Sequence, residues 1–229
     1  MKTKLAFLAV LSLAAATLHA QTLAQWTFET SGSAYNTAVT ASSIGGIVPE
    51  IGAGFASGVH ASASAAWSSP VGNGSAESLS VNNWAVGDYW QFEVSTVGYQ
   101  GILFSFDQTS SSTGPRDFRL AYSTDGSSFT SFATYSVLAN ASPNAWTSST
   151  YNPLHTYSFD LSSITAIDNE PNVYLRLIAD STVSANGGTV ATTGTDRVDN
   201  VTVSVVPEPT ALALVGLGLA GLVITRRRA

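Results

Sequence analysis

Few side chains in this sequence could serve as a nucleophile or a general base. The chain of 229 residues has no cysteine and three histidines, of which only His60 and His155 lie beyond the first twenty residues. A hydrolytic triad needs a base held beside its nucleophile, and neither histidine adjoins a motif that would expose a serine in that way. The sequence therefore predicts no catalytic residues.

Two carboxylates, Glu93 and Asp107, are the remaining candidates for acid–base chemistry. Glycoside hydrolysis uses a pair of carboxyl groups on either side of the bond that is cleaved. Each residue alternates with apolar residues of its own segment, so we expect both on the solvated face of a sheet, where charge is ordinarily placed. A glycan-active enzyme is therefore only the second alternative to the main hypothesis.

The densest polar cluster is the run that begins at Asp196 and ends at Asn200. Calcium binds six to eight oxygen atoms, and Asp196 and Asp199 could supply part of such a set together with backbone carbonyls. The alternatives are an ion pair of Asp199 with Arg119 or Arg197, or a turn cap. The sequence requires no cofactor, and a structural calcium at this cluster is the one candidate.

Aromatic residues offer a different chemistry, because a sugar ring can stack on an exposed aromatic face. Trp84 and Tyr99 lie in expected connections between strands, and they are the better candidates for stacking on a ligand in this way. Trp90 alternates in phase with Phe92 and is expected in the core, where most aromatic residues of a sheet protein lie.

Alternation with a period of two residues predicts the elements that position these side chains. The predicted strands are Leu23–Glu29, Tyr89–Val94, Gly101–Asp107, Phe118–Thr124, Phe129–Tyr135, Tyr157–Leu161, Val173–Leu177 and Asn200–Val205. Asp125-Gly126 predicts a hairpin, and residues 162–168 predict one helical turn. The fold class is therefore all-β, an antiparallel β-sandwich of the jelly-roll type.

The charges are unevenly distributed along the chain. Fourteen of the fifteen acidic residues and four of the nine basic residues lie between positions 21 and 205, so that part has a net charge of about −10. A surface this acidic repels phosphate backbones and anionic lipids. We therefore expect no nucleic-acid partner.

The first twenty residues have the pattern of a signal peptide. Lys2 and Lys4 form a positive start, an apolar stretch follows, and Ala20 precedes Gln21 at a suitable cleavage site. This pattern predicts export through the translocon.

The last 24 residues combine three features in order. Pro207, Glu208 and Pro209 come first, and an apolar run extends from residue 211 to residue 224. That run would span roughly 21 Å as a helix, less than the ~30 Å hydrocarbon core, and could insert if the bilayer thins. The final feature is a basic cluster, Arg226, Arg227 and Arg228, which would remain in the cytoplasm.

This combination resembles the PEP-CTERM sorting tail. The resemblance implies an exported protein of a Gram-negative bacterium that makes exopolysaccharide. It also implies recognition of Pro207, Glu208 and Pro209 by an exosortase, a membrane processing enzyme. The stretch from Asn82 to Val205 separately resembles a β-sandwich module of exported bacterial proteins, and this second resemblance implies a fold and a location but no reaction.

Three parts follow: a signal peptide (1–20), a β-sandwich domain (21–205) and a sorting tail (206–229). The main hypothesis is a non-enzymatic protein that is anchored briefly in the inner membrane and then displayed or released with exopolysaccharide in a biofilm. The first alternative is a carbohydrate-binding module that grips extracellular polysaccharide.

Overall fold

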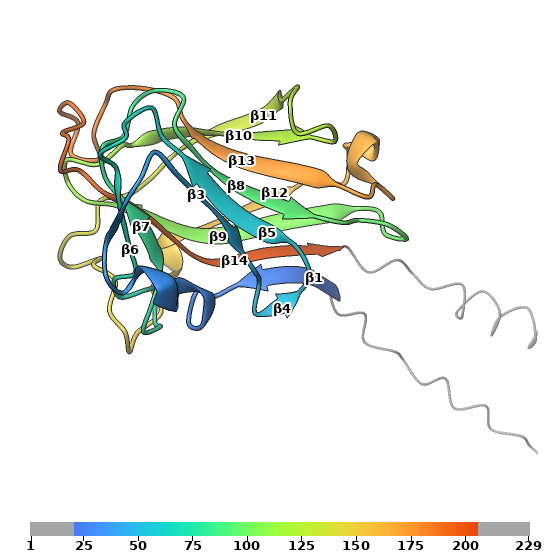
Figure 1. Cartoon of the computed structure of the whole chain (residues 1–229), viewed down its shortest axis with the longest axis horizontal. Helices are drawn as coiled ribbons and strands as arrows, with labels where there is room; N and C mark the ends of the chain where they lie inside the picture. The colour runs from blue at the N-terminus through green and yellow to red at the C-terminus, as the bar shows by residue number, and fades with distance from the viewer. Residues whose placement is uncertain (1–20, 206–229) are drawn as a thin grey trace, which may run out of the picture. The chain divides into compact units, whose positions relative to one another are not determined.

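The computed structural model describes residues 21–205, which form two antiparallel β-sheets packed face to face (Figure 1). The expected signal peptide helix, the cleavage-site residue Ala20 and the apolar C-terminal helix lie outside the described residues. The same holds for the sorting and basic residues Pro207, Glu208, Pro209, Arg226, Arg227 and Arg228.

One sheet has eight strands. Its main path runs β12-β9-β14-β7-β6-β2, and β1 pairs with both β14 and β4. The strands are β1 (Gln21–Trp26), β2 (Val39–Thr40), β4 (Ile51–Gly52), β6 (Ala66–Ser68), β7 (Leu79–Val81), β9 (Ile102–Ser110), β12 (Thr156–Asp160) and β14 (Asp196–Val205).

The other sheet has six strands in the order β11-β10-β13-β8-β5-β3. They are β3 (Ser43–Ile47), β5 (Phe55–Val59), β8 (Tyr89–Val94), β10 (Asp117–Ser123), β11 (Thr130–Ser136) and β13 (Val173–Ala179). The predicted hairpin at Asp125-Gly126 is confirmed, because β10 and β11 pair antiparallel on either side of it.

Helical structure in the described part of the chain is limited to three short 3₁₀ segments. These are η1 (Ser31–Tyr35), η2 (Pro153–His155) and η3 (Thr165–Ile167), and η3 lies within the predicted helical turn at residues 162–168. Between residues 21 and 205 there is no helix with the length and apolar character needed to cross a bilayer.

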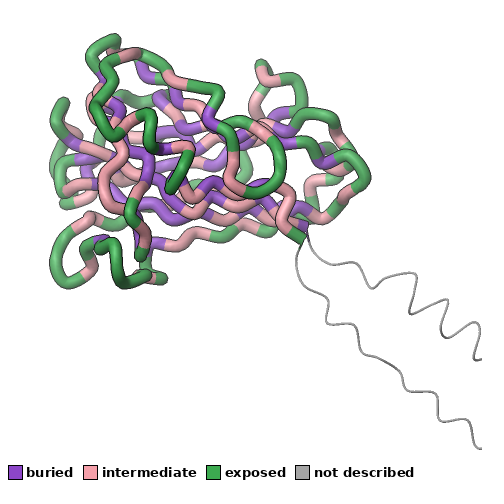
Figure 2. Tube along the Cα trace, turned by 60° about the horizontal axis from the view of Figure 1, so that its bottom comes forward, coloured by how far each residue is buried: buried purple, intermediate pink, exposed green. Residues whose placement is uncertain are grey.

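The core lies between the two sheets. Figure 2 shows buried residues along the strands and exposed ones in the connections. On β8, Trp90 and Phe92 are fully buried, as predicted from their alternation, and Leu175 and Leu177 of β13 pack in the same layer. Burying a large apolar side chain contributes about 1.5–3 kcal/mol, so the alternation fixes which face of each strand turns inward.

The segment from residue 39 to residue 81 forms strands that the sequence pattern did not predict. Strands β2 to β7 lie there, and each has two to five residues. This segment is rich in Gly, Ser and Ala, so it lacks the alternation of large apolar residues from which the other strands were recognised.

The two described ends of the chain lie side by side. Gln21 is paired with Val205, and the antiparallel pairing continues to Trp26 and Val201 with one register shift. The first and last strands of the domain are therefore neighbours in the eight-stranded sheet.

Candidate functional site

The outer face of the six-stranded sheet presents aromatic and polar side chains in register across its strands. Tyr89, Gln91 and Glu93 on β8, and Tyr174 and Arg176 on β13, point outward because their chain neighbours are buried in the core. Ala121, Ser123 and Ile178 share this side through strand pairing but are themselves buried. Three rungs cross β5, β8, β13 and β10 in that order: Phe55, Glu93, Tyr174 and Ser123; Ser57, Gln91, Arg176 and Ala121; Val59, Tyr89, Ile178 and Arg119. We call this surface the outer face.

Arg176 occupies the middle of the outer face and is held on three sides. Its guanidinium carbon lies 3.9 Å from the centroid of the Tyr89 ring and 3.6 Å from that of Phe129. Its Nε donates to Oε1 of Gln91 at 2.7 Å. Between residues 21 and 205 it makes no ion pair with a carboxylate. Cation–π contacts of this kind contribute about 0.5–2 kcal/mol each, so the guanidinium is oriented before any ligand arrives.

The β10–β11 hairpin brings Phe129 to Arg176. Oδ1 of Asp125 accepts from the backbone amides of Ser127 and Ser128, and these bonds lower the pKa of Asp125 well below its ordinary value. Gly126 has φ +71°, and a Cβ there would lie 3.2 Å from the Tyr174 ring. Only glycine adopts this conformation without strain, so the turn can close over the outer face.

The rung next to Arg176 combines an aromatic ring with an acid. Burial raises the pKa of Tyr174. The neighbouring Glu93 carboxylate, which is hydrogen-bonded to the Tyr174 hydroxyl, raises it further. Phe55, on the same rung, is half exposed at 50 %. The outer face therefore carries ring surfaces, a guanidinium, an amide and a carboxylate on neighbouring strands of one sheet.

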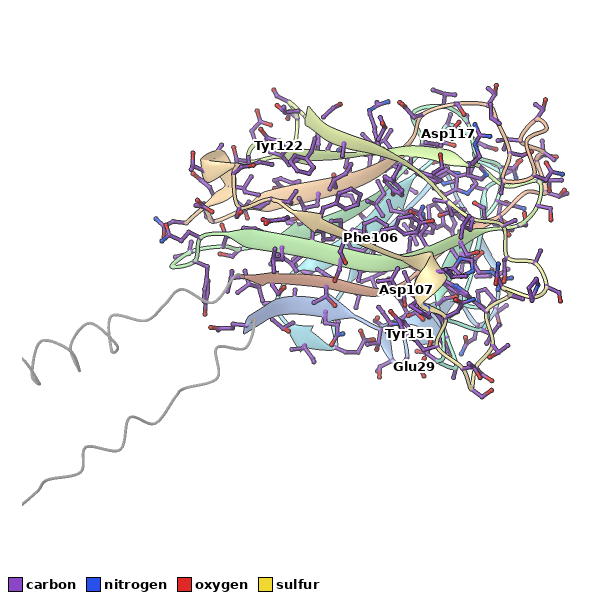
Figure 3. All side chains as sticks on the ribbon, turned by 180° about the vertical axis from the view of Figure 1, so that it is seen from behind. Glu29, Phe106, Asp107, Asp117, Tyr122 and Tyr151 are labelled. Carbon is purple, nitrogen blue, oxygen red and sulfur yellow. The ribbon has the colours of Figure 1, made fainter. Side chains whose placement is uncertain are left out.

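Glu93 and Asp107 do not form a carboxylate pair. Glu93 belongs to the outer face of the six-stranded sheet, whereas Asp107 lies on β9 of the other sheet. Figure 3 shows Asp107 on the eight-stranded sheet and Asp117 on the opposite one. The expectation that Asp107 is solvated is wrong, because it is 2 % exposed and its oxygens accept from Thr156, Asn73 and Asn200.

Asp196 points into the space between the sheets. Its Oδ1 accepts from Nε1 of Trp90 at 2.7 Å and from Nε2 of Gln108 at 2.9 Å. Its Oδ2 lies 3.0 Å from Oγ of Ser110. Burial raises the pKa of Asp196 to about 7, although the hydrogen bonds from Gln108 and Trp90 oppose the shift.

Asp199 lies on the other face of β14 and is also buried. Its Oδ2 accepts from Oγ of Ser75 at 2.6 Å and from the backbone amide of Asn73 at 2.9 Å, and its Oδ1 accepts from the backbone amide of Asn200. Burial raises its pKa to about 7, and the donors lower it in part. The expected ion pairs of Asp199 with an arginine are absent between residues 21 and 205.

These positions do not fit the expected calcium. Asp196 and Asp199 contact different residues on opposite faces of one strand, so they cannot share an ion. Their oxygens face N–H and O–H donors, whereas calcium requires a shell of oxygen ligands. Residues 21–205 also contain no group of three or more His, Asp or Glu side chains placed to hold a metal ion.

The two aromatic residues expected to stack on a ligand lie apart from each other. Trp84 is 7 % exposed, donates from Nε1 to the carbonyl of Val81 and packs against the rings of His60 and Phe118. That burial leaves no open ring face. Tyr99 packs partly against the core, and its hydroxyl accepts from Nε2 of Gln21. Neither residue belongs to the outer face.

Both histidines of the domain are structural. Nδ1 of His60 lies 3.3 Å from Oδ2 of Asp88, and burial lowers the pKa of His60 more than this carboxylate raises it. Nε2 of His155 contacts the carbonyl of Asn144 at 2.7 Å. In the described part of the chain no serine hydroxyl bonds either ring.

The described part of the chain is therefore a two-sheet β-sandwich with one aromatic and polar outer face. Similarity to known proteins adds information on the export of the chain. Residues 205–228 match the PEP-CTERM protein-sorting motif, and the chain therefore carries the signal of an exosortase substrate. This motif marks an exported protein with a transient membrane anchor. Among curated proteins none matches the sequence significantly.

Solved structures with a similar fold include β-sandwich carbohydrate-binding modules and cleaved adhesin domains of Lys-gingipain. The CBM22-1 and GH10 modules of Clostridium thermocellum xylanase 10B, complexed with xylohexaose, match at 15 % identity and TM-score 0.46, covering 84 % of this chain and 30 % of that one. The CBM22-1 xylan-binding domain of Paenibacillus barcinonensis Xyn10C matches at 11 % identity and TM-score 0.40, covering 83 % and 98 %. The N-terminal cellulose-binding domain of Cellulomonas fimi β-1,4-glucanase C matches at 16 % identity and TM-score 0.30, covering 55 % and 76 %.

The central residue of the outer face was missed by sequence reasoning. Alternation along β8 does place Tyr89 and Gln91 opposite the core, so their outward position was readable. Arg176 alternates in the same way on β13, but no local signal pairs it with Gln91, which lies 85 positions earlier. The pairing of these strands is a tertiary property.

Proposed function

We propose that this exported protein binds extracellular polysaccharide through the outer face and performs no catalysis there. The observation that carries the proposal is the guanidinium of Arg176, fixed between the rings of Tyr89 and Phe129 and bonded to Gln91. An oriented guanidinium donates to sugar hydroxyl or carboxyl oxygens with little loss of side-chain entropy.

The shape and chemistry of the outer face support a polymeric ligand. Its rungs cross four neighbouring strands, and strands lie about 4.8 Å apart, so the surface is long enough for several sugar units. Ring faces at Tyr89 and Phe55 would stack on the C–H faces of sugars. Gln91 and Glu93 would hydrogen-bond hydroxyl groups.

Direct binding measurements test this proposal. Exopolysaccharide from the producing bacterium, soluble xylan and a mixed-linkage β-glucan would be titrated into residues 21–205, with affinity electrophoresis as a screen and calorimetry for the affinity. Tyr89→Ala and Arg176→Ala should each weaken binding about tenfold or more, which corresponds to about 1.4 kcal/mol.

The matched control is Tyr151→Ala. Tyr151 is an exposed tyrosine, 52 % accessible, in the connection before β12 of the eight-stranded sheet. Binding equal to that of the wild type is expected. Loss of affinity in all three variants alike, or no binding of any polysaccharide by the wild type, would reject the outer face as the site.

We also propose that the sorted protein is displayed at or released from the cell surface of a Gram-negative bacterium, within its exopolysaccharide. Support comes from the sorting motif at residues 205–228, together with the signal peptide pattern of residues 1–20. The intact mass of the protein from the medium should correspond to a chain that begins at Gln21 and ends near Pro209. A full-length chain that stays in the membrane would refute processing.

A further inference from the structure

The middle of the outer face presents hydrogen-bond donors that are free. Nε of Arg176 donates to Oε1 of Gln91, which leaves Nη1 and Nη2 of the guanidinium and Nε2 of the amide. Within residues 21–205 these three nitrogen atoms have no hydrogen-bond partner, and none of them is a buried atom. Since a guanidinium can only donate, the amide must keep its oxygen toward Arg176 and its NH₂ group away from that bond. The centre of the outer face is therefore open to a group that accepts.

The side chains next to this pair supply hydroxyl groups. Ser57 lies opposite Gln91 on β5, and the ring of Tyr89 lies against Arg176. A hydroxyl can donate as well as accept, so neither side chain removes the excess of donors. A ligand group that accepts two hydrogen bonds and donates none matches this place best.

Arg176 also lacks a counter-ion within the domain. Arg119, on the same outer face, forms an ion pair with Asp180, and Arg116 forms one with Asp117. The fourth arginine of the domain lies on β14 of the other sheet. In the part of the chain that the structure describes, no carboxylate lies within ion-pair distance of Arg176, although two rings leave its side chain half-buried. Burying a charge is costly unless it is paired, so an anionic ligand group would stabilise this guanidinium.

We propose that the polysaccharide bound by the outer face is acidic, and that the carboxylate of a uronic acid unit lies against Nη1 and Nη2 of Arg176. This inference rests on the proposed function and names the class of its ligand. Because Gln91 occupies Nε, the remaining pair of donors is Nη1 and Nη2, and two parallel N–H groups match the two oxygens of a carboxylate. A sugar hydroxyl in the same place would bring a proton that no atom of the guanidinium can accept. The NH₂ group of Gln91 is left for a hydroxyl of the neighbouring sugar unit.

The carboxylates of the outer face limit how densely this polymer is charged. Burial raises the pKa of Tyr174, and the charges of Glu93 and Asp125 raise it further, so both acids lie near that ring, whose rung adjoins that of Arg176. A polymer with a carboxylate on every unit would be repelled by them. A polymer in which neutral sugars separate the uronic acids would instead place hydroxyls beside Glu93 and a ring face on the half-exposed Phe55.

Matched pairs of polymers test this inference on the wild type and require no variant. Glucuronoxylan, hyaluronan and the exopolysaccharide of the producing bacterium would each be titrated by calorimetry into residues 21–205, which form one compact unit. Each would be titrated again after chemical reduction of its carboxyl groups, which leaves the backbone and the linkages unchanged. In every pair that is bound, the acidic form should bind about tenfold more tightly than the reduced form.

The possible results separate this inference from the proposed function. Equal or tighter binding of the reduced polymers would overturn the acidic ligand, and the outer face would remain a polysaccharide site. Failure of all the polymers to bind would reject the proposed function, and this inference with it.

Two variants of equal charge show which arginine is responsible. Arg176→Gln should bring the ratio of the two affinities in each pair close to one, because the pair of Nη donors and the positive charge are removed together. Arg119→Gln is the matched control, because it removes the same charge from the same outer face, where Arg119 already pairs with Asp180. Its ratio should stay near the wild-type value. A ratio that falls equally in both variants would assign the preference to net charge and overturn the role of Arg176.

Discussion

Replacing Asp196 by asparagine should stabilise the protein at pH 8 and change little at pH 4. Asp196 is completely buried, and its pKa of about 7 compares with an ordinary value of about 3.9. A difference of about three units corresponds to about 4 kcal/mol, an order-of-magnitude value for a group without solvent contact.

The hydrogen bonds around Asp196 fit the protonated acid. Oγ of Ser110 lies 2.6 Å from the carbonyl oxygen of Pro115 and 3.0 Å from Oδ2 of Asp196. A hydroxyl has one proton to donate and a carbonyl can only accept, so the shorter contact takes that proton. The contact between Ser110 and Asp196 is then completed by a proton on the carboxyl group. An asparagine amide would donate in the same place.

The sign of the pH effect follows from the raised pKa. As pH rises above about 4, the unfolded chain loses the Asp196 proton while the folded protein keeps it until pH 7. The unfolded state then binds fewer protons, so the free energy of unfolding falls over this window. Asp196→Asn removes this loss of stability. The free energy of unfolding at pH 8 should therefore rise by up to about 4 kcal/mol.

Urea unfolding followed by tryptophan fluorescence at pH 4 and pH 8 measures both values. Asp199→Asn is the contrasting variant, because the N–H and O–H groups around Asp199 point at its oxygens, and an amide would face donors. It should lose stability at pH 8, where Asp199 is ionised in the folded protein and Asp196→Asn gains stability. If Asp196→Asn is equally destabilised at both, Asp196 is ionised in the folded protein and the reasoning fails.

Three further substitutions probe the packing. Glu50→Gln should cost about 1–3 kcal/mol in urea unfolding, because the Glu50 carboxylate accepts three backbone amides and one hydroxyl from residues 27–31; an unchanged midpoint would contradict this. Asn200→Ala should lower the melting temperature, since Asn200 has φ +48° and its amide bridges two buried carboxylates, and a rise would refute that role. Gly58→Ala should cost about 1–3 kcal/mol, because a Cβ there would lie 2.4 Å from the Trp67 ring; a neutral result would mean that the ring moves aside at no cost.

The sequence alone established the properties that depend on neighbouring residues. Alternation places Trp90 and Phe92 inward, and a β-hairpin follows from Asp125-Gly126, because strand pleat and turn conformation are set within a few residues. The sorting motif at residues 205–228 is likewise a local signal, and the all-β class follows from many such segments together.

The tertiary structure decided what depends on residues far apart in the chain. Strand pairing brings Arg176 to Tyr89 and Phe129, and it turns Asp196 and Asp199 to opposite sides of one strand. Trp84 lies in a connection, yet rings from several strands cover it. Burial is a sum over distant neighbours, and no stretch of sequence specifies which strands will supply them. For that reason the outer face and the buried carboxylates became visible only in the folded chain.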